Sequence, residues 1–170
     1  GGGVVVGGKL LSGPNALAGE WGHNPLPWPT DEERPGPKCY CGKTGCIETF
    51  LSGPGLAADL AHQTGNAGLT AAEIVAAASQ NDGPAAQVLR RYCDRLARAL
   101  ASVVNLLDPD IIVLGGGLSN TAALYDELPA LMGTYVFGDD ARTPVRPAVH
   151  GDSSGVRGAA WLWPDAEENG

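Results

Sequence analysis

Apolar residues recur at helical spacing over residues 84–107, the longest such stretch of the chain. The positions concerned are Val88, Leu89, Tyr92, Leu96, Leu100, Val103 and Leu107. Side chains three and four residues apart share one face of a helix, so the pattern predicts an amphipathic helix. The charged residues are expected mostly on its solvent side: Arg90, Arg91, Asp94, Arg95 and Arg98. Cys93 has no cysteine or histidine beside it and is interpreted as a buried apolar residue.

The chain before residue 51 has a different pattern. Two short β-rich runs at residues 4–6 and 9–11 flank a pair of glycines, which predicts a β-hairpin. Residues 12–37 follow, and the prolines at positions 25, 27, 29, 35 and 37 exclude a regular helix there. Long irregular loops inside compact domains usually serve a function, so this stretch is a first place to look for a binding site.

After residue 51 the pattern is that of helices and short strands. Thr70 and Glu73 fit a capping box, which predicts a short helix through residue 78. The apolar run at residues 111–114 predicts a buried parallel strand. The remaining expected elements are a helix over 121–136, a strand at 145–149 and a closing helix at 155–163. Pro129 either starts a new helix within 121–136 or kinks the existing one. This order of strands and helices indicates an α/β fold.

The composition narrows the class of protein. The chain has 170 residues, 44% of them hydrophobic and 18% charged, which is typical of a globular protein. Its net charge of −8 argues against a nucleic-acid-binding face, because such a face needs clustered lysine and arginine. No apolar run approaches the roughly 20 residues that span a bilayer. We therefore expect neither a nucleic-acid partner nor a membrane.

Three cysteines and a histidine lie close together in the sequence: His23, Cys39, Cys41 and Cys46. They are the residue types of a tetrahedral zinc site. On an extended chain Cys39 and Cys41 point to the same side, whereas a disulfide between them would close a small, strained ring. Gly42 and Gly45 allow turns that bring the last cysteine back to the same centre. The spacing favours zinc in a reducing cytoplasm over disulfides or free thiols.

Two glutamates flank this cluster, with Glu20 shortly before His23 and Glu48 shortly after Cys46. If a metal holds one ring nitrogen of His23, the other nitrogen faces outward and can bind a hydroxyl group. Carboxylates accept hydrogen bonds from vicinal hydroxyls, as in sugar recognition. The alternative is a solvated loop acid at Glu20 and a helix cap at Glu48. Two carboxylates around a metal-fixed histidine favour a polyol site.

Two glycine triplets are candidates for contact with a nucleotide. Gly115, Gly116 and Gly117 follow a predicted strand and precede a helix, where free N–H groups favour phosphate. They match neither the GxGxxG nor the P-loop pattern, and such a turn is also ordinary α/β architecture. Gly1, Gly2 and Gly3 are interpreted as the end of a second phosphate-contacting hairpin. His62 and His150 are isolated and are assigned structural or surface roles.

Together these motifs resemble the ROK family (repressors, open reading frames, kinases). The matching segments are EWGHNPL at residues 20–26, CxCGxxGCxE at 39–48, LGGG at 114–117 and HGDSSGVRGAA at 150–160. Trp21 and residues 24–28 look most like bacterial fructokinases of the mannose- and fructose-phosphorylating type. N-acetylglucosamine kinases are the second most similar group.

The resemblance implies the C-terminal lobe of an actin-like ATPase (ribonuclease H-like) fold with a structural zinc loop. Residues 12–50 would form the sugar- and zinc-binding region, and residues 51–163 an α/β lobe with an adenosine-side glycine loop. The implied zinc ligands are His23, Cys39, Cys41 and Cys46. The implied sugar contacts are Glu20, His23 and Glu48, and Gly115 to Gly117 would lie near the adenosine.

The reaction implied by the resemblance is transfer of the ATP γ-phosphoryl group to the 6-hydroxyl of a hexose, with Mg²⁺ bridging the phosphates. Fructose is the expected hexose, with N-acetylglucosamine or glucose as alternatives. In the family a DxGxT segment and the aspartate base belong to an N-terminal lobe that this sequence does not contain. The 170-residue chain alone is therefore expected to be inactive. A cytoplasmic homodimer is also implied.

Two alternatives stay open. The same lobe would serve as the inducer sensor of a ROK transcriptional repressor, which a helix-turn-helix upstream would identify. The other alternative is a zinc-stapled module without a ligand, in which Glu20→Ala and Glu48→Ala leave sugar affinity unchanged.

Overall fold

The computed structural model describes residues 1–80, 83–138 and 142–160. The helices are α1 (Ile47–Phe50), α2 (Gly53–Thr64), α3 (Ala71–Ala78), α4 (Pro84–Leu107), α5 (Ala122–Gly133) and α6 (Ser154–Ala160). The strands are β1 (Val5–Val6), β2 (Lys9–Leu10), β3 (Ile112–Leu114) and β4 (Val145–Pro147). Short 3₁₀ helices are η1 (Trp21–His23), η2 (Asp31–Glu33), η3 (Gly117–Asn120) and η4 (Gly151–Ser153). The predicted α/β class is confirmed.

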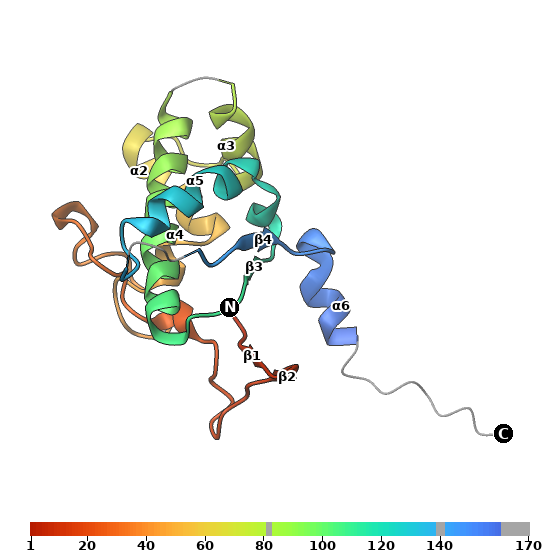
Figure 1. Ribbon diagram of the computed structural model, residues 1–170. Coiled ribbons are helices and arrows are strands. Elements are labelled where there is room, and N and C mark those ends of the chain that lie inside the picture. The colour runs from red at the N-terminus through yellow and green to blue at the C-terminus, as the bar shows by residue number, and fades with distance from the viewer. Residues whose placement is uncertain (81–82, 139–141, 161–170) are drawn as a thin grey trace.

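Helix α4 runs through the middle of the molecule, and α2, α3 and α5 pack around it (Figure 1). Its predicted bounds are confirmed. Pro84 occupies the first turn, where a missing N–H costs nothing, and Asp108 ends the helix in the left-handed conformation (φ 43°). The predicted α3 also forms, with Glu73 and Thr70 bonding each other's backbone N–H groups as a capping box.

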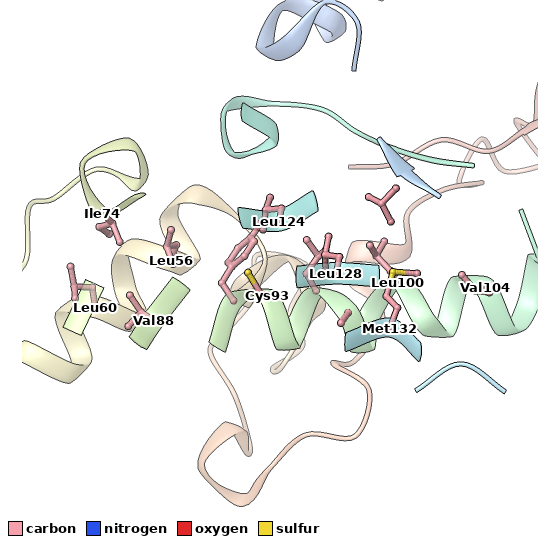
Figure 2. Close-up of a cluster of buried hydrophobic side chains, with 14 residues drawn as sticks. Leu56, Leu60, Ile74, Val88, Cys93, Leu100, Val104, Leu124, Leu128 and Met132 are labelled. Carbon is pink, nitrogen blue, oxygen red and sulfur yellow. The ribbon is translucent and has the colours of Figure 1, made fainter. Parts of the chain in front are cut away.

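The main core lies between α4 and the helices around it (Figure 2). Leu56, Ile74 and Leu128 meet the apolar side of α4 there, and Cys93 is fully buried among them, as predicted. The apolar stripe of α4 ends earlier than its spacing suggests. Val104 is buried, whereas Leu107 is 53% exposed, and all three residues that follow Val104 in the helix are exposed.

The strands form two small sheets. Strands β1 and β2 make the predicted antiparallel hairpin, and Gly7 and Gly8 both take the positive φ that a tight hairpin turn requires. Strands β3 and β4 pair in parallel, as expected for residues 111–114. The expectation that this strand is buried is wrong for one face. Ile112 and Leu114 pack on the core, but Val113 is 55% exposed on the opposite face.

Two of the C-terminal elements, α5 and β4, are shorter than predicted. Helix α5 ends at Gly133, and Pro129 lies inside this single helix instead of starting another. Strand β4 ends at Pro147, and residues 161–163 of the expected closing helix lie outside the described residues. Among the described helices, none is both long and apolar enough to cross a membrane.

The solvent-side assignment of the charged residues on α4 is wrong at two positions. Arg95 is 8% exposed and Arg98 only 2% exposed. The proline-containing loop before residue 38, irregular as predicted, lies against this side of α4 and supplies Glu33 as their shared ion-pair partner. A loop that carries the right carboxylate thus turns a polar helix face into an interior one.

Candidate metal and sugar site

A tight turn and two bridges bring the predicted ligands together. Cys39 N–H bonds to the Lys43 carbonyl, and Gly42 N–H bonds to the Cys39 carbonyl, so residues 39–42 form a turn. The expected extended geometry of Cys39 and Cys41 is therefore wrong, although the two side chains still converge. Gly42 (φ 88°) and Gly45 (φ 71°) supply the left-handed turns, and a β-bridge joins Cys46 to the loop before it at Pro25.

The four predicted ligand residues lie in one cluster, with one ligand atom from each within 4.8 Å of all the others. Cys39 Sγ is 3.6 Å from His23 Nδ1, and Cys41 Sγ is 3.6 Å from Cys46 Sγ. These separations match the edges of a tetrahedron with metal–ligand bonds of about 2.0–2.3 Å. They are far longer than the roughly 2.05 Å of a disulfide, and all four cysteines of the chain are free thiols. The donor set and its spacing fit zinc.

The cysteines of the cluster sit in contrasting environments. A backbone hydrogen bond from Lys43 lowers the pKa of the exposed Cys41 thiol to about 7. Burial, together with the neighbouring Cys41 and Cys39, raises the pKa of Cys46 to about 12. A thiolate at Cys41 is therefore available at neutral pH, whereas Cys46 needs a cation to hold its charge inside the protein.

The second nitrogen of His23 faces the two predicted sugar-binding carboxylates. Its Nε2 is 3.9 Å from Glu20 Oε2 and 3.9 Å from Glu48 Oε2. Glu20 directly precedes η1, and Glu48 lies in the first turn of α1, so each carboxylate lies close in the chain to a residue of the cluster. The structure thus brings Glu20, His23 and Glu48 to one place.

Tyr40 is a site residue that sequence reasoning missed. Its hydroxyl lies 2.9 Å from His23 Nε2, and its exposed ring meets the imidazole edge to face. Partial desolvation and the nearby Glu48 and Glu20 raise the pKa of Tyr40. Its place between two cysteines was the available signal, but an alternating strand would have turned it away from them.

The structure places the two glycine triplets differently. Gly2 lies against Gly19 and the Trp21 ring, so closely that a side chain on Gly2 would collide with both. The first triplet therefore adjoins Glu20. Gly115, Gly116 and Gly117 are exposed after β3, with open space where side chains would stand.

Two isolated histidines and one cavity lie away from the residues of the predicted site. His62 and His150 are exposed, in agreement with a surface role. A cavity of about 800 Å³ lies by the end of α4, where Asn105, Asp108 and Phe137 line it together with residues outside the predicted site.

Comparison with known proteins identifies the family. The ROK family profile matches residues 1–166, so the chain belongs to the ROK family. An N-acetyl-D-glucosamine kinase from Aliivibrio salmonicida (strain LFI1238) is 41% identical over 167 residues. That match covers 95% of this chain and 55% of the relative. The chain thus spans about half the length of the curated relatives it matches.

Solved structures agree with this assignment. A ROK hexokinase from Thermus thermophilus has a TM-score of 0.77 at 31% identity, over 93% of this chain and 51% of that one. A ROK family glucokinase from Streptomyces griseus, solved with glucose and AMPPNP, also reaches 0.77, at 28% identity over 94% and 55% of the two chains. The fold is therefore shared with about half of a ROK sugar kinase.

Proposed function

We propose that this chain is the sugar-reading half of an ATP-dependent hexose kinase that phosphorylates the 6-hydroxyl group. The observation that carries the proposal is the two-sided placement of His23. Its Nδ1 faces the cysteines, while its Nε2 faces Glu20 and Glu48. A histidine held in this way links a metal centre to a pair of carboxylates suited to a polyol.

In this proposal His23, Cys39, Cys41 and Cys46 hold a structural zinc ion. All four coordination positions of a tetrahedral zinc would then be filled by the protein, which would leave no open position for chemistry on the metal. Coordination through Nδ1 leaves the proton on Nε2, so this nitrogen donates to a sugar hydroxyl oxygen. Glu20 and Glu48 accept hydrogen bonds from neighbouring hydroxyls of the same sugar.

The nucleotide side of the proposal rests on the glycines. Gly2 packs on Trp21, and this contact supports a phosphate-binding hairpin directly beside the sugar carboxylates. Gly115, Gly116 and Gly117 are proposed to lie near the adenosine of ATP, with Mg²⁺ bound to its phosphates. A homodimer and a cytoplasmic location stay predictions.

Two hexoses are the leading candidates for the substrate. Fructose is favoured by the resemblance of Trp21 and residues 24–28, but the relatives compared give it no support. N-acetyl-D-glucosamine is favoured by the 41% identity to a kinase named for that sugar. An enzyme discriminates between substrates by how strongly it binds their transition states. The ratio of kcat/KM between the hexoses therefore decides which one is the substrate.

The test uses the protein expressed from its complete coding sequence, with ATP and Mg²⁺ and each of fructose, mannose, glucose and N-acetyl-D-glucosamine. We expect phosphorylation of at least one hexose. Glu20→Gln and Glu48→Gln should each raise the KM for that hexose at least tenfold, since each removes a charged acceptor worth about 1.5–3 kcal/mol. Glu32→Gln, an exposed neighbour on the same loop, is the matched control and should change nothing.

The outcomes separate the alternatives. Hexose binding in a calorimeter without phosphoryl transfer would identify a sugar sensor, the repressor alternative. An unchanged hexose KM in both glutamate variants would show that Glu20 and Glu48 do not bind the sugar, so this segment would then be a zinc-stapled module that does not itself bind the ligand.

A further inference from the structure

The guanidinium of Arg98 is enclosed by the protein and binds the loop that carries the proposed site. Its Nη1 contacts the Pro27 carbonyl at 3.1 Å and the Trp28 carbonyl at 2.8 Å. The same group makes a two-pronged contact with Glu33, with N–O distances of 2.9 and 2.8 Å. Its Nε binds Asp94 of the same helix at 3.0 Å. Each of the three guanidinium nitrogens is thus hydrogen-bonded, and of their partners only Asp94 belongs to the same helix as Arg98.

The backbone at this contact is held in an unfavourable conformation. Trp28 has a φ of 44°, the left-handed region that a bulky residue rarely adopts. Its carbonyl is bound by Arg98, and its ring stacks on Tyr135 with 5.6 Å between centroids. Tyr135 in turn donates to Asp94 at 2.8 Å. Such strain persists only where surrounding contacts over-determine it, and it concentrates at functional sites.

The same loop segment is tied on its other side to the metal and sugar residues. Leu26 N–H bonds to the Gly45 carbonyl, and Ile47 N–H bonds to the Asn24 carbonyl, both at 2.9 Å. Leu26 and Ile47 are buried in a small apolar cluster with Ala99, the residue next to Arg98 on α4. Residues 24–28 therefore lie between α4 and the segment that contains Cys46 and Glu48, with His23 at their start.

We propose that Arg98 is a positioning residue for the sugar site. It fixes residues 24–28 on α4 and thereby sets the spacing between His23 and Glu48, although it touches neither. The inference rests on the proposed function, because it assigns Arg98 to hexose binding. Arg95 offers a matched comparison. It is also buried and also binds Glu33, but its other ion pair is with Asp59 on α2 and not with the loop carbonyls.

The test compares Arg98→Lys with Arg95→Lys in the protein from the complete coding sequence. Lysine keeps the charge but has only three donors on a single nitrogen, so it cannot reproduce the two-pronged contact with Glu33 together with the bonds to two carbonyls and Asp94. Both variants should lose stability. Only Arg98→Lys should raise the hexose KM, by tenfold or more, because small misplacements of binding groups cost that much. The KM for ATP and the zinc content should stay unchanged, a split that general destabilisation does not produce.

If Arg98→Lys does not fold, the double variant Glu33→Gln with Arg98→Met is measured instead, since it leaves no unpaired buried charge at either position. The same rise in hexose KM is expected. An unchanged hexose KM in the folded variant, or equal rises for hexose and ATP, overturns the positioning role. A wild-type protein that phosphorylates no hexose overturns the proposed function itself, so the two failures are distinguishable.

Discussion

The His23–cysteine cluster and the Glu33–Arg95–Arg98 network are two polar constellations joined by one loop, and they differ in how they are stabilised. The cluster lies in a turn, partly exposed, and its charges need a metal to hold them together. The network is buried, and its charges are balanced within the protein once the ion pairs of Arg95 with Asp59 and of Arg98 with Asp94 are included. A chelator should remove the proposed metal from the first, whereas the second is weakened by mutation or by acid that protonates Glu33. The loop therefore has one anchor that depends on a bound metal and one that depends only on groups of the protein.

The largest expected effect comes from breaking the cluster. Cys46→Ala removes one of the four proposed zinc ligands and should abolish zinc binding. The effect should be large, because a structural zinc bound by such ligands contributes about 10 kcal/mol or more of folding free energy. Residues 12–50 should become sensitive to limited proteolysis, while α4 and its core survive. Zinc content by atomic emission and the proteolysis pattern by mass spectrometry measure both.

Cys93→Ala is the control for this change, since Cys93 lies in the main core and outside the cluster. It should retain one zinc per chain. A Cys46→Ala protein with full zinc content and an intact loop would show that the cluster neither binds the zinc nor orders residues 12–50.

The next largest effect comes from breaking the network. Burial alone would raise the pKa of Glu33, but hydrogen bonds from Arg98 and Arg95 hold it at about 2, below its ordinary 4.5. This difference corresponds to about 3 kcal/mol of stability at neutral pH. Because the folded pKa is lowered, that stability is present above about pH 4.5 and is lost as the pH falls towards 2.

Glu33→Gln should therefore destabilise the protein by about 3 kcal/mol at pH 7, and its deficit relative to wild type should shrink between pH 4.5 and 2. Urea denaturation at several pH values measures this. The exposed Glu32→Gln should lie within about 0.5 kcal/mol of wild type. A deficit independent of pH would mean that Glu33 acts through packing and not through its charge.

The smallest expected effect concerns Tyr40, which lies over the cluster. Its hydroxyl occupies the His23 nitrogen that we assign to a sugar hydroxyl. Tyr40→Phe removes this competitor, so the hexose KM should fall about two- to fivefold, the worth of a net hydrogen bond of about 0.5–1 kcal/mol. Steady-state kinetics measure the change, with Tyr125→Phe as a distant control. A rise in hexose KM would instead make Tyr40 a sugar contact.

The two constellations also differ in how far the sequence predicts them. The cluster could be predicted because its cysteines are close neighbours with glycines between them, and α4 because its periodicity is long. The network could not, because the partner of Arg95 and Arg98 lies 62 and 65 residues away. Whether an arginine on a helix meets water or a loop is decided by the packing of that loop, which periodicity does not encode.

Two errors of detail have local causes. Cys39 and Cys41 converge through a turn and not through an extended strand, and that turn also directs Tyr40 to His23. A rule of alternation fails wherever glycines bend the chain. Val113 was expected to be buried because it belongs to an apolar run, but only one face of the two-stranded sheet packs on the core.

The burial of Cys93 makes its thiol a chemical reporter of unfolding in the helical core. Burial raises the pKa of this thiol to about 12, so at neutral pH alkylating reagents reach it only when α4 leaves the core. The other three of the four free cysteines should become reactive once the proposed zinc ion is withdrawn and the loop opens. Mass spectrometry during labelling would therefore resolve two steps. The time at which three cysteines are labelled would give the rate at which the loop opens. The time at which the fourth is labelled would give the rate at which the helices unfold.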